Sequence, residues 1–380
     1  MNRSYLARFV PLFIVTSTPA IAADWDKAHN NVVAFLGMQS NNNVFNTAEQ
    51  RQADVRQTAG VGWDWLGLFE GYGVQLPVQV SRQNYRDTAD LAETLYKLQP
   101  QMRFFLSAQT DLAIQATLEK DQILAGDGAA EFIESTDKAF LAEHSGLEAT
   151  VQFGRAPDTQ NLRLTVGTNQ RQQKIRDKIY SELDSDSAQG QYSHKLNENV
   201  ALIVDVASRQ ENQNRIDSSL LQYGAGISVQ WTGQQFFRLT GGRYDRRYPS
   251  TVLSSVSGSF WQLDNLWQFD ERWQLQVQSG RSSVLSYATT SISQLDTHHL
   301  LSLRWQYDQS HQFGAEISRL ISNLDQDKYY RTRSAVGANW RWQWAQQWHS
   351  VLQLSQVRQS QHLLADRNRL ELAAEVTWSW

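Results

Sequence analysis

Apolar and polar residues alternate along most of the chain after Asn31, in stretches of about ten residues separated by turn residues. Alternation with a period of two is typical of strands that have one apolar and one polar face. The last stretch is the clearest, because its apolar face carries Leu370, Leu372, Ala374, Val376, Trp378 and Trp380. The pattern therefore predicts an all-β protein.

The alternating stretches predict about 18 strands, with 16 as the fallback because the eighth stretch is the weakest. Their expected ranges are 31–40, 54–66, 73–86, 94–106, 111–123, 139–153, 161–171, 187–196, 199–209, 218–231, 235–243, 256–269, 273–283, 294–307, 312–321, 332–344, 349–358 and 368–380. Helical spacing occurs only at Ile175, Ile179 and Leu183, which fits either a loop helix or a strand extension.

The connections between these strands alternate in length. Short ones are expected at 107–109, 197–198, 232–233, 270–271, 308–310 and 345–347, and long ones at 41–53, 124–138, 172–186, 244–255 and 359–367. Bacterial outer-membrane barrels have short periplasmic turns, long external loops and an even number of strands. We therefore expect an antiparallel up-and-down transmembrane β-barrel in the bacterial outer membrane, with both termini in the periplasm.

The first residues predict an export signal. Arg3 and Arg8 precede a short apolar run, which Ala20, Ile21 and Ala22 follow as a small-residue cleavage site. We expect residues 1–22 to be a signal peptide and residues 23–380 to be the barrel.

Tryptophan gathers near the short turns, in the same register as the apolar residues. An indole ring suits the membrane interface, because its body is apolar and its N–H is polar. We expect a periplasmic aromatic girdle, rather than ordinary core packing, from Trp63, Trp65, Trp231, Trp267, Trp305, Trp342, Trp344, Trp378 and Trp380.

Arginine marks the opposite ends of several strands, in the same outward register. These residues either bind lipopolysaccharide phosphates through charge-assisted hydrogen bonds or simply extend into water. They are Arg82, Arg243, Arg281, Arg319 and Arg358.

Composition supports an exported barrel and excludes some other classes. The formal net charge is −4, there is no cysteine, and no basic block indicates a nucleic-acid partner. Mean hydropathy is low at −0.52 although 11% of the residues are aromatic. That combination suits a wall with one lipid face and one water face.

The polar register predicts the residues that line the pore. Positive and negative charges are balanced there, which favours a neutral or weakly charged solute, although internal ion pairs that brace the wall explain the same balance. The expected lining includes Arg56, Lys97, Arg103, Glu119, Glu148, Arg163, Arg238, Asp264, Arg304, Arg333, Arg341, Glu371 and Glu375.

Candidate chemistry beyond a pore is sparse. His144 and Ser145 are adjacent in a strand and so point to opposite faces, which excludes a nucleophile and base pair. The histidines lack metal-ligand spacing and no phosphate-binding loop occurs. We expect neither an enzyme nor a cofactor. The acidic loop 124–138 either folds inward as a constriction or caps the barrel in solvent.

The segment Asn41-Asn42-Asn43-Val44-Phe45 resembles the signature that opens the β-barrel porin 2 family, except that Asn42 replaces the usual acid. Members of that family include outer-membrane barrels encoded with exopolysaccharide biosynthesis systems. The terminal Trp380 also resembles the recognition signal of the outer-membrane assembly machinery.

The resemblance implies a passive pore that exports an exopolysaccharide, with outer-membrane lipids, lipopolysaccharide, the polysaccharide and periplasmic polymer-synthesis proteins as partners. The alternative is a diffusion porin for sugar or general nutrient uptake. An outer-membrane enzyme or adhesin is a weaker alternative.

Overall fold

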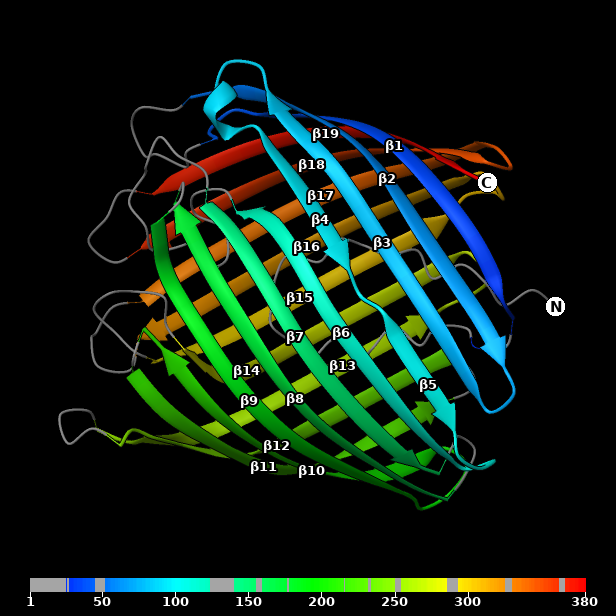
Figure 1. Ribbon diagram of the computed structural model, residues 1–380, viewed down its shortest axis with the longest axis vertical. Helices are drawn as coiled ribbons and strands as arrows, with labels where there is room; N and C mark the ends of the chain where they lie inside the picture. Colours follow the sequence, from blue (N-terminus) through cyan, green and yellow to red (C-terminus); the bar gives the residue numbers. More distant parts are fainter. Residues whose placement is uncertain are drawn as a thin grey trace.

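A computed structural model shows one closed barrel of antiparallel strands (Figure 1). It describes residues 25, 27–44, 52–123, 140–154, 159–175, 178–214, 216–231, 234–249, 254–285, 293–324, 330–361 and 366–380. The predicted signal peptide lies outside these residues. No helix among the described residues is long and apolar enough to cross a membrane.

The strands follow one another around the barrel in chain order, and β1 pairs with β19 to close it. They are β1 (His29–Asn41), β2 (Asp54–Phe69), β3 (Tyr72–Tyr85), β4 (Glu93–Leu98), β5 (Gln101–Phe105), β6 (Thr110–Ile123), β7 (Phe140–Phe153), β8 (Gln160–Ile175), β9 (Lys178–Lys195), β10 (Val200–Gln213), β11 (Ile216–Trp231), β12 (Gln235–Arg247), β13 (Val256–Gln268), β14 (Trp273–Leu285), β15 (Ser293–Gln306), β16 (His311–Leu324), β17 (Tyr330–Ala345), β18 (Trp348–Gln361) and β19 (Arg367–Ser379). A short 3-10 helix, η1 (Ala89–Leu91), precedes β4.

β4 and β5 are two halves of one barrel strand, since both pair with β3 on one side and β6 on the other. Pro100 lies between them and has no N–H to donate to the ladder. The backbone still connects at the break, because Gln99 N donates to Pro77 O at 3.1 Å and Ala116 N donates to Pro100 O at 3.0 Å. The wall therefore has the predicted 18 strands, and that prediction is confirmed.

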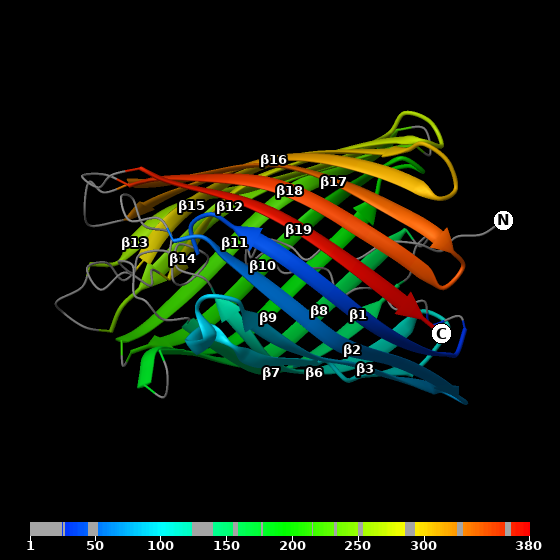
Figure 2. The ribbon, with the colours of Figure 1, turned by 90° about the horizontal axis from the view of Figure 1, so that it is seen from above.

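The two ends of the barrel differ in most of their connections, although at the second end two residues join β8 to β9 and two join β10 to β11. At one end, tight turns join β2 to β3, β9 to β10, β13 to β14, β15 to β16 and β17 to β18, and β19 ends there beside the start of β1 (Figure 2). Three of these turns share one device, in which a side-chain oxygen of Asn197, Asp270 or Asp308 accepts two backbone N–H bonds. Such Asx turns close a strand connection without further residues.

The long loop expected at 172–186 is absent, and the helical interpretation of Ile175 to Leu183 is wrong. β8 and β9 instead continue as a paired ladder to Ile175 and Lys178. Serine and aspartate alternate here, with Ser181 buried and Asp186 exposed. A strand whose two faces are both polar has no apolar alternation, so the pattern could not reveal it.

The two faces of the wall have opposite character. Large apolar side chains are exposed on one register, such as Leu36 at 66% and Val166 at 56%. The other register holds the buried polar side chains, such as Asn41 at 4% and Arg369 at 3%. Side chains crowd together on the concave side of a closed barrel, so the polar register faces the interior and the apolar register faces outward.

Candidate functional site in the barrel interior

The interior register brings several of the predicted charged residues into ion pairs. Arg103 Nη2 lies 2.7 Å from Asp111 Oδ2, and Lys97 Nζ lies 3.5 Å from Glu119 Oε1. Arg238 is paired across strands with Asp264 and lies 3.9 Å from Asp205. Ion pairs that brace the wall therefore account for part of the charge balance.

The remaining predicted interior residues contact polar partners or lie among them. Arg56 donates to Gln39 and Gln83, Asp264 accepts from Gln278 at 3.2 Å, and Glu371 accepts from Asn41 at 3.2 Å. Thr150 donates to Glu148, and Thr377 donates to Glu375. Cross-strand register places Arg163 between Gln152 and Gln191, Arg304 opposite Gln274, Arg333 opposite Gln359 and Arg341 opposite Gln312.

The interior charges are balanced in number but separated in space. Acidic side chains prevail from β2 to β7, and basic side chains prevail from β8 to β12 and from β17 to β19, which lie at the bottom and top of Figure 1. The acidic wall includes Asp54, Asp64, Asp111, Glu119, Asp121 and Glu148, beside the basic Arg56, Lys97 and Arg103. The first basic wall includes Arg163, Arg171, Lys195, Arg209, Arg238 and Arg246, beside the acidic Asp205 and Glu211. The second basic wall includes Arg331, Arg333, Arg341 and Arg369, beside the acidic Glu371 and Glu375. The net charge summed over the whole interior is therefore balanced, although two parts of the wall are cationic.

Three interior arginines that the sequence analysis did not single out are almost fully buried. Arg246 is 0% exposed, and its guanidinium donates to Glu211, Ser218 and Ser283. Arg331 and Arg369 are each 3% exposed. All three lie near strand ends that the predicted ranges cut short or barely included. Extending the inward alternation by two residues, from Arg333 to Arg331, would have found Arg331, whereas Arg246 lies further beyond its predicted strand and Arg369 was already inside one.

At the end opposite the tight turns, the first two loops are fastened to the wall. Asp54 accepts backbone N–H bonds from Val55, Asp87 and Thr88 and the hydroxyl bond of Thr88. Tyr85 donates to Gln122, which in turn donates to the carbonyl of Leu91 at 2.9 Å. We call this set of contacts the mouth cluster.

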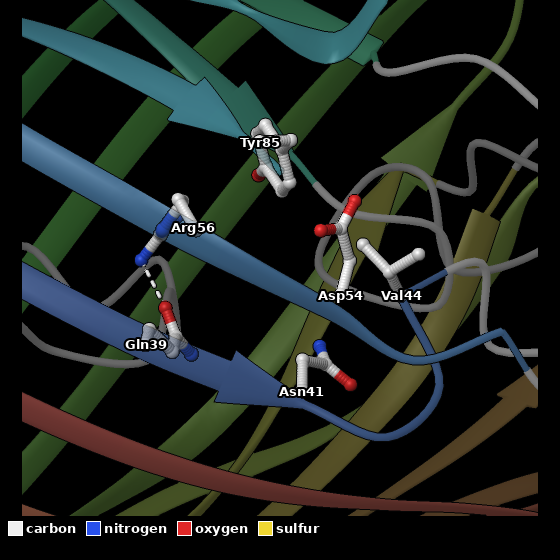
Figure 3. Close-up of a pocket in the computed structure, with 6 residues that line it drawn as sticks. All are labelled: Gln39, Asn41, Val44, Asp54, Arg56 and Tyr85. Carbon is white, nitrogen blue, oxygen red and sulfur yellow. Dashed lines mark hydrogen bonds between the residues drawn. The ribbon is translucent and has the colours of Figure 1, made fainter. Parts of the chain in front are cut away.

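The mouth cluster also has an apolar centre. Val44, Tyr85 and Leu91 pack together and are 1%, 7% and 1% exposed. Figure 3 shows Val44 beside Asp54, with Tyr85 facing them and Arg56 bonded to Gln39 below. Two loops therefore meet in a buried apolar contact at this part of the mouth.

The asparagines of the Asn41–Phe45 motif hold the first loop against the last strand. Asn41 Oδ1 accepts from Asn43 N at 2.8 Å, Asn43 Nδ2 donates to Asn368 O at 3.0 Å, and Asn42 Oδ1 accepts from Leu370 N at 2.8 Å. The motif thus spans the seam where β1 meets β19. The proposed constriction at 124–138 lies outside the described residues.

The predicted girdle tryptophans lie on the outward register toward the tight-turn end. Trp231 is 68% exposed and Trp380 is 49% exposed. From β14 to β19 the rings form a continuous row with successive centroids 4.0 to 6.1 Å apart, made of Trp273, Trp305, Phe313, Trp340, Trp342, Trp344, Trp348, Trp378 and Trp380. Trp63 donates to Asn30 on the neighbouring strand, and Trp65 and Trp267 complete the predicted set.

The five predicted rim arginines have outward register near the opposite end. Arg82, Arg243, Arg319 and Arg358 are exposed, whereas Arg281 is half-buried opposite Trp261. Arg358 already has an anionic partner, since its Nη2 lies 2.6 Å from Asp366. That bond holds the pKa of Asp366 below its ordinary value.

Catalytic groups do not assemble in the part of the chain that the structure describes. His144 contacts Asn169 at 3.3 Å from the inward register, whereas Ser145 has the opposite register. No three His, Asp or Glu residues within that part are grouped as metal ligands.

No family model and no curated relative matches the chain. Solved structures do match in fold. The structure of OpdK from Pseudomonas aeruginosa with vanillate has a TM-score of 0.56 at 10% identity, covering 92% of this chain and 99% of that one. OccAB4 from Acinetobacter baumannii has a TM-score of 0.54 at 8% identity, covering 94% and 100%.

OccK2 (OpdF) from Pseudomonas aeruginosa, in complex with glucuronate, has a TM-score of 0.54 at 10% identity, covering 93% of this chain and 98% of that one. These likenesses show that the chain has the fold of outer-membrane porins along nearly its whole length. The fold and the charged interior together define the class, a large porin-type β-barrel.

Proposed function

We propose that this protein is a passive pore of the bacterial outer membrane that admits small polar solutes, with a preference for those that carry a carboxylate. Barrels of 16 to 18 strands leave an aqueous channel, whereas barrels of about 8 strands fill with side chains. This wall has 18 strands, and most of the side chains buried in its interior are polar. The tight turns and both termini of the barrel chain then face the periplasm.

The observation that carries the carboxylate preference is the separation of charge inside the barrel. Arginines on β17 to β19 and basic residues on β8 to β12 form two cationic walls. Arg304 and Arg341 also lie on neighbouring inward rows and are half-buried, so a solute can reach them. A guanidinium fork binds a carboxylate through two parallel hydrogen bonds.

Two of the similar barrels support the same chemistry. One was solved with vanillate and the other in complex with glucuronate, and both ligands carry a carboxylate. The balanced number of interior charges favours a neutral solute, but the positions of those charges favour a solute with a carboxylate. We therefore propose the carboxylate in place of the neutral solute.

Export of an exopolysaccharide rests on the resemblance of residues 41–45 alone, and no family model matches the chain. The Asn41–Asn43 segment has a structural role at the seam that accounts for its amides without a polymer. We therefore favour uptake over export, and periplasmic polymer-synthesis partners belong only to the export hypothesis.

The test is permeation through the purified full chain in lipid vesicles. Swelling rates are measured with glucose and with glucuronate, two solutes of similar size that differ in charge. We expect both to enter and glucuronate to enter faster at equal concentration. Equal rates would remove the carboxylate preference, and no swelling with either solute would remove the pore.

Deletion of the gene separates uptake from export. Loss of uptake should slow growth on a carboxylate as the sole carbon source and leave secreted polymer unchanged. Polymer that accumulates in the periplasm would instead support the export hypothesis.

A further inference from the structure

A groove of about 590 Å³ crosses the outer wall over β18, β19, β1, β2, β3 and β4. Most of its lining has outward register, and the groove forms where the small side chains Ala34 and Ala59 interrupt larger neighbours such as Leu36 and Val61. The lining is almost wholly apolar. It is therefore a recess in the surface that faces the hydrocarbon of the membrane.

The two ends of this groove differ chemically. Trp348 and Trp378 border it on β18 and β19, where their rings stack with centroids 5.9 Å apart. Arg82 and Thr94 border it on β3 and β4, where they are directly paired across the strands. The groove thus has an aromatic, interfacial end and a cationic end.

Arg82 is held in position and keeps its charge available. Its Nη1 donates to Thr94 Oγ1 at 3.0 Å and its Nε donates to Asn84 Oδ1 at 3.3 Å, and the side chain remains exposed. The nearby carboxylate of Glu93 is paired with Lys120 at 3.0 Å. A guanidinium has five donor hydrogens, so several remain for an outside anion.

We infer that this groove binds one phosphate-bearing lipid of the surrounding membrane, with an acyl chain along Ala34 and Ala59 and the phosphate on Arg82. An apolar recess that ends in a single oriented cation matches an amphiphile with one charged end. This inference rests on the proposed outer-membrane location and is independent of solute transport. It assigns Arg82 a bound lipid and makes no such assignment for the other rim arginines.

The test measures lipid binding to the purified full barrel by native mass spectrometry in a maltoside detergent. Phosphatidylglycerol and diacylglycerol are the two probes, because they share acyl chains but differ in the phosphate. We expect phosphatidylglycerol to bind about tenfold more tightly than diacylglycerol, because only its phosphate forms charge-assisted bonds with Arg82. Arg82→Gln should abolish this difference, and Ala59→Leu should weaken the binding of both probes.

Two matched controls separate the groove from the rest of the outer wall. Ala338→Leu adds the same side chain at an exposed outward position on β17, and Arg319→Gln removes another exposed outward arginine. Neither should change the tightest lipid site. If Arg82→Gln and Ala59→Leu bind as the wild type does, the groove holds no specific lipid.

The competing occupant is a second copy of the chain. Light scattering after size exclusion gives the oligomeric state of the same samples. A wild-type oligomer that Ala59→Leu converts to monomer, with no loss of lipid binding, would assign the groove to a subunit interface and overturn the inference.

Discussion

Asn43 Nδ2 donates a hydrogen bond to the backbone carbonyl of Asn368 at 3.0 Å, and so joins the first loop to the start of the last strand, 325 residues later in the chain. Asn43 is fully buried. Its neighbour Asn42 makes two further bonds to Leu370, through its backbone N and its side-chain oxygen. The seam that closes the barrel is therefore reinforced by side chains as well as by the strand ladder.

Asn43→Ala should destabilise the barrel by about 1–3 kcal/mol, because the fully buried Asn43 side chain is lost and the part-buried carbonyl of Asn368 loses its donor. The measurement is the midpoint of thermal unfolding in detergent, monitored by the difference in electrophoretic mobility between the folded and the heated protein. Asn212→Ala is the control, since Asn212 is half-buried and its side-chain hydrogen bond to Asp217 lies in an exposed setting. It should change stability by no more than about 0.5 kcal/mol. Equal effects of the two variants would contradict a special role for the seam.

Asp54→Asn should loosen the segment between β3 and β4. The carboxylate of Asp54 accepts from Asp87 N, Thr88 N and the Thr88 hydroxyl, and an amide presents N–H to some of those donors. We expect a noisier single-channel current in planar bilayers with the barrel still folded. Asp87→Asn makes the same charge change in the same segment, where the side chain is exposed, and should leave the current unchanged.

The strands themselves were largely predictable, because lipid on one side and water on the other impose a period of two. Leu370 to Trp380 illustrates this, since β19 spans Arg367–Ser379 and the expected strand was 368–380. The prediction failed where that contrast is missing. Ser181 and Asp186 are both polar, so β9 was expected to begin at residue 187 when it begins at Lys178.

The candidate site was predictable in register but not in arrangement. Parity along each strand identifies Arg304 and Asp264 as inward residues, since strand geometry alone decides it. Which charges gather on one wall depends on how the strands close around the barrel. The bonds of Asn43 to Asn368 and of Asp54 to Thr88 depend on loops, whose paths no periodic pattern encodes.

The turn at Asp308 should respond to acid. Its carboxylate accepts backbone N–H bonds from Ser310 and His311, which hold the pKa of Asp308 below its ordinary value of 3.8. The charged form thus favours the turn at neutral pH, and this contribution is lost as the pH falls below about 4 through the lowered pKa.

Hydrogen exchange of the Ser310 and His311 amides measures this contribution. Asp308→Ala should speed their exchange at neutral pH. Asp308→Asn should keep most of the protection, as Asn197 does in its own turn, and should remove the dependence on acid. If Asp308→Ala exchanges as slowly as the wild type, the side chain does not hold the turn.

Gly73→Ala should displace Trp25 from the interior wall. A Cβ at Gly73 would lie 2.6 Å from the Trp25 ring, which also packs edge-on against Phe105 at 6.4 Å and lies 6.0 Å from the Arg103 guanidinium. We expect the free energy of unfolding to fall by about 1–3 kcal/mol. A double-mutant cycle with Trp25→Ala checks the cause, because Gly73→Ala should cost little once the ring is absent.

Removing two inward arginines should lower the preference of the pore for anions. Arg304 and Arg341 lie on β15 and β17 in half-buried inward positions, and in the proposed pore their charge attracts anions into the channel. We expect Arg304→Gln with Arg341→Gln to reduce the chloride to potassium permeability ratio roughly twofold, since the summed positive potential falls while the wall keeps its polarity. The reversal potential in a potassium chloride gradient gives this ratio. Arg243→Gln with Arg319→Gln removes the same charge from the outward face and should leave the ratio unchanged; a shift of equal size would mean that net charge, and not the inward position of Arg304 and Arg341, sets selectivity.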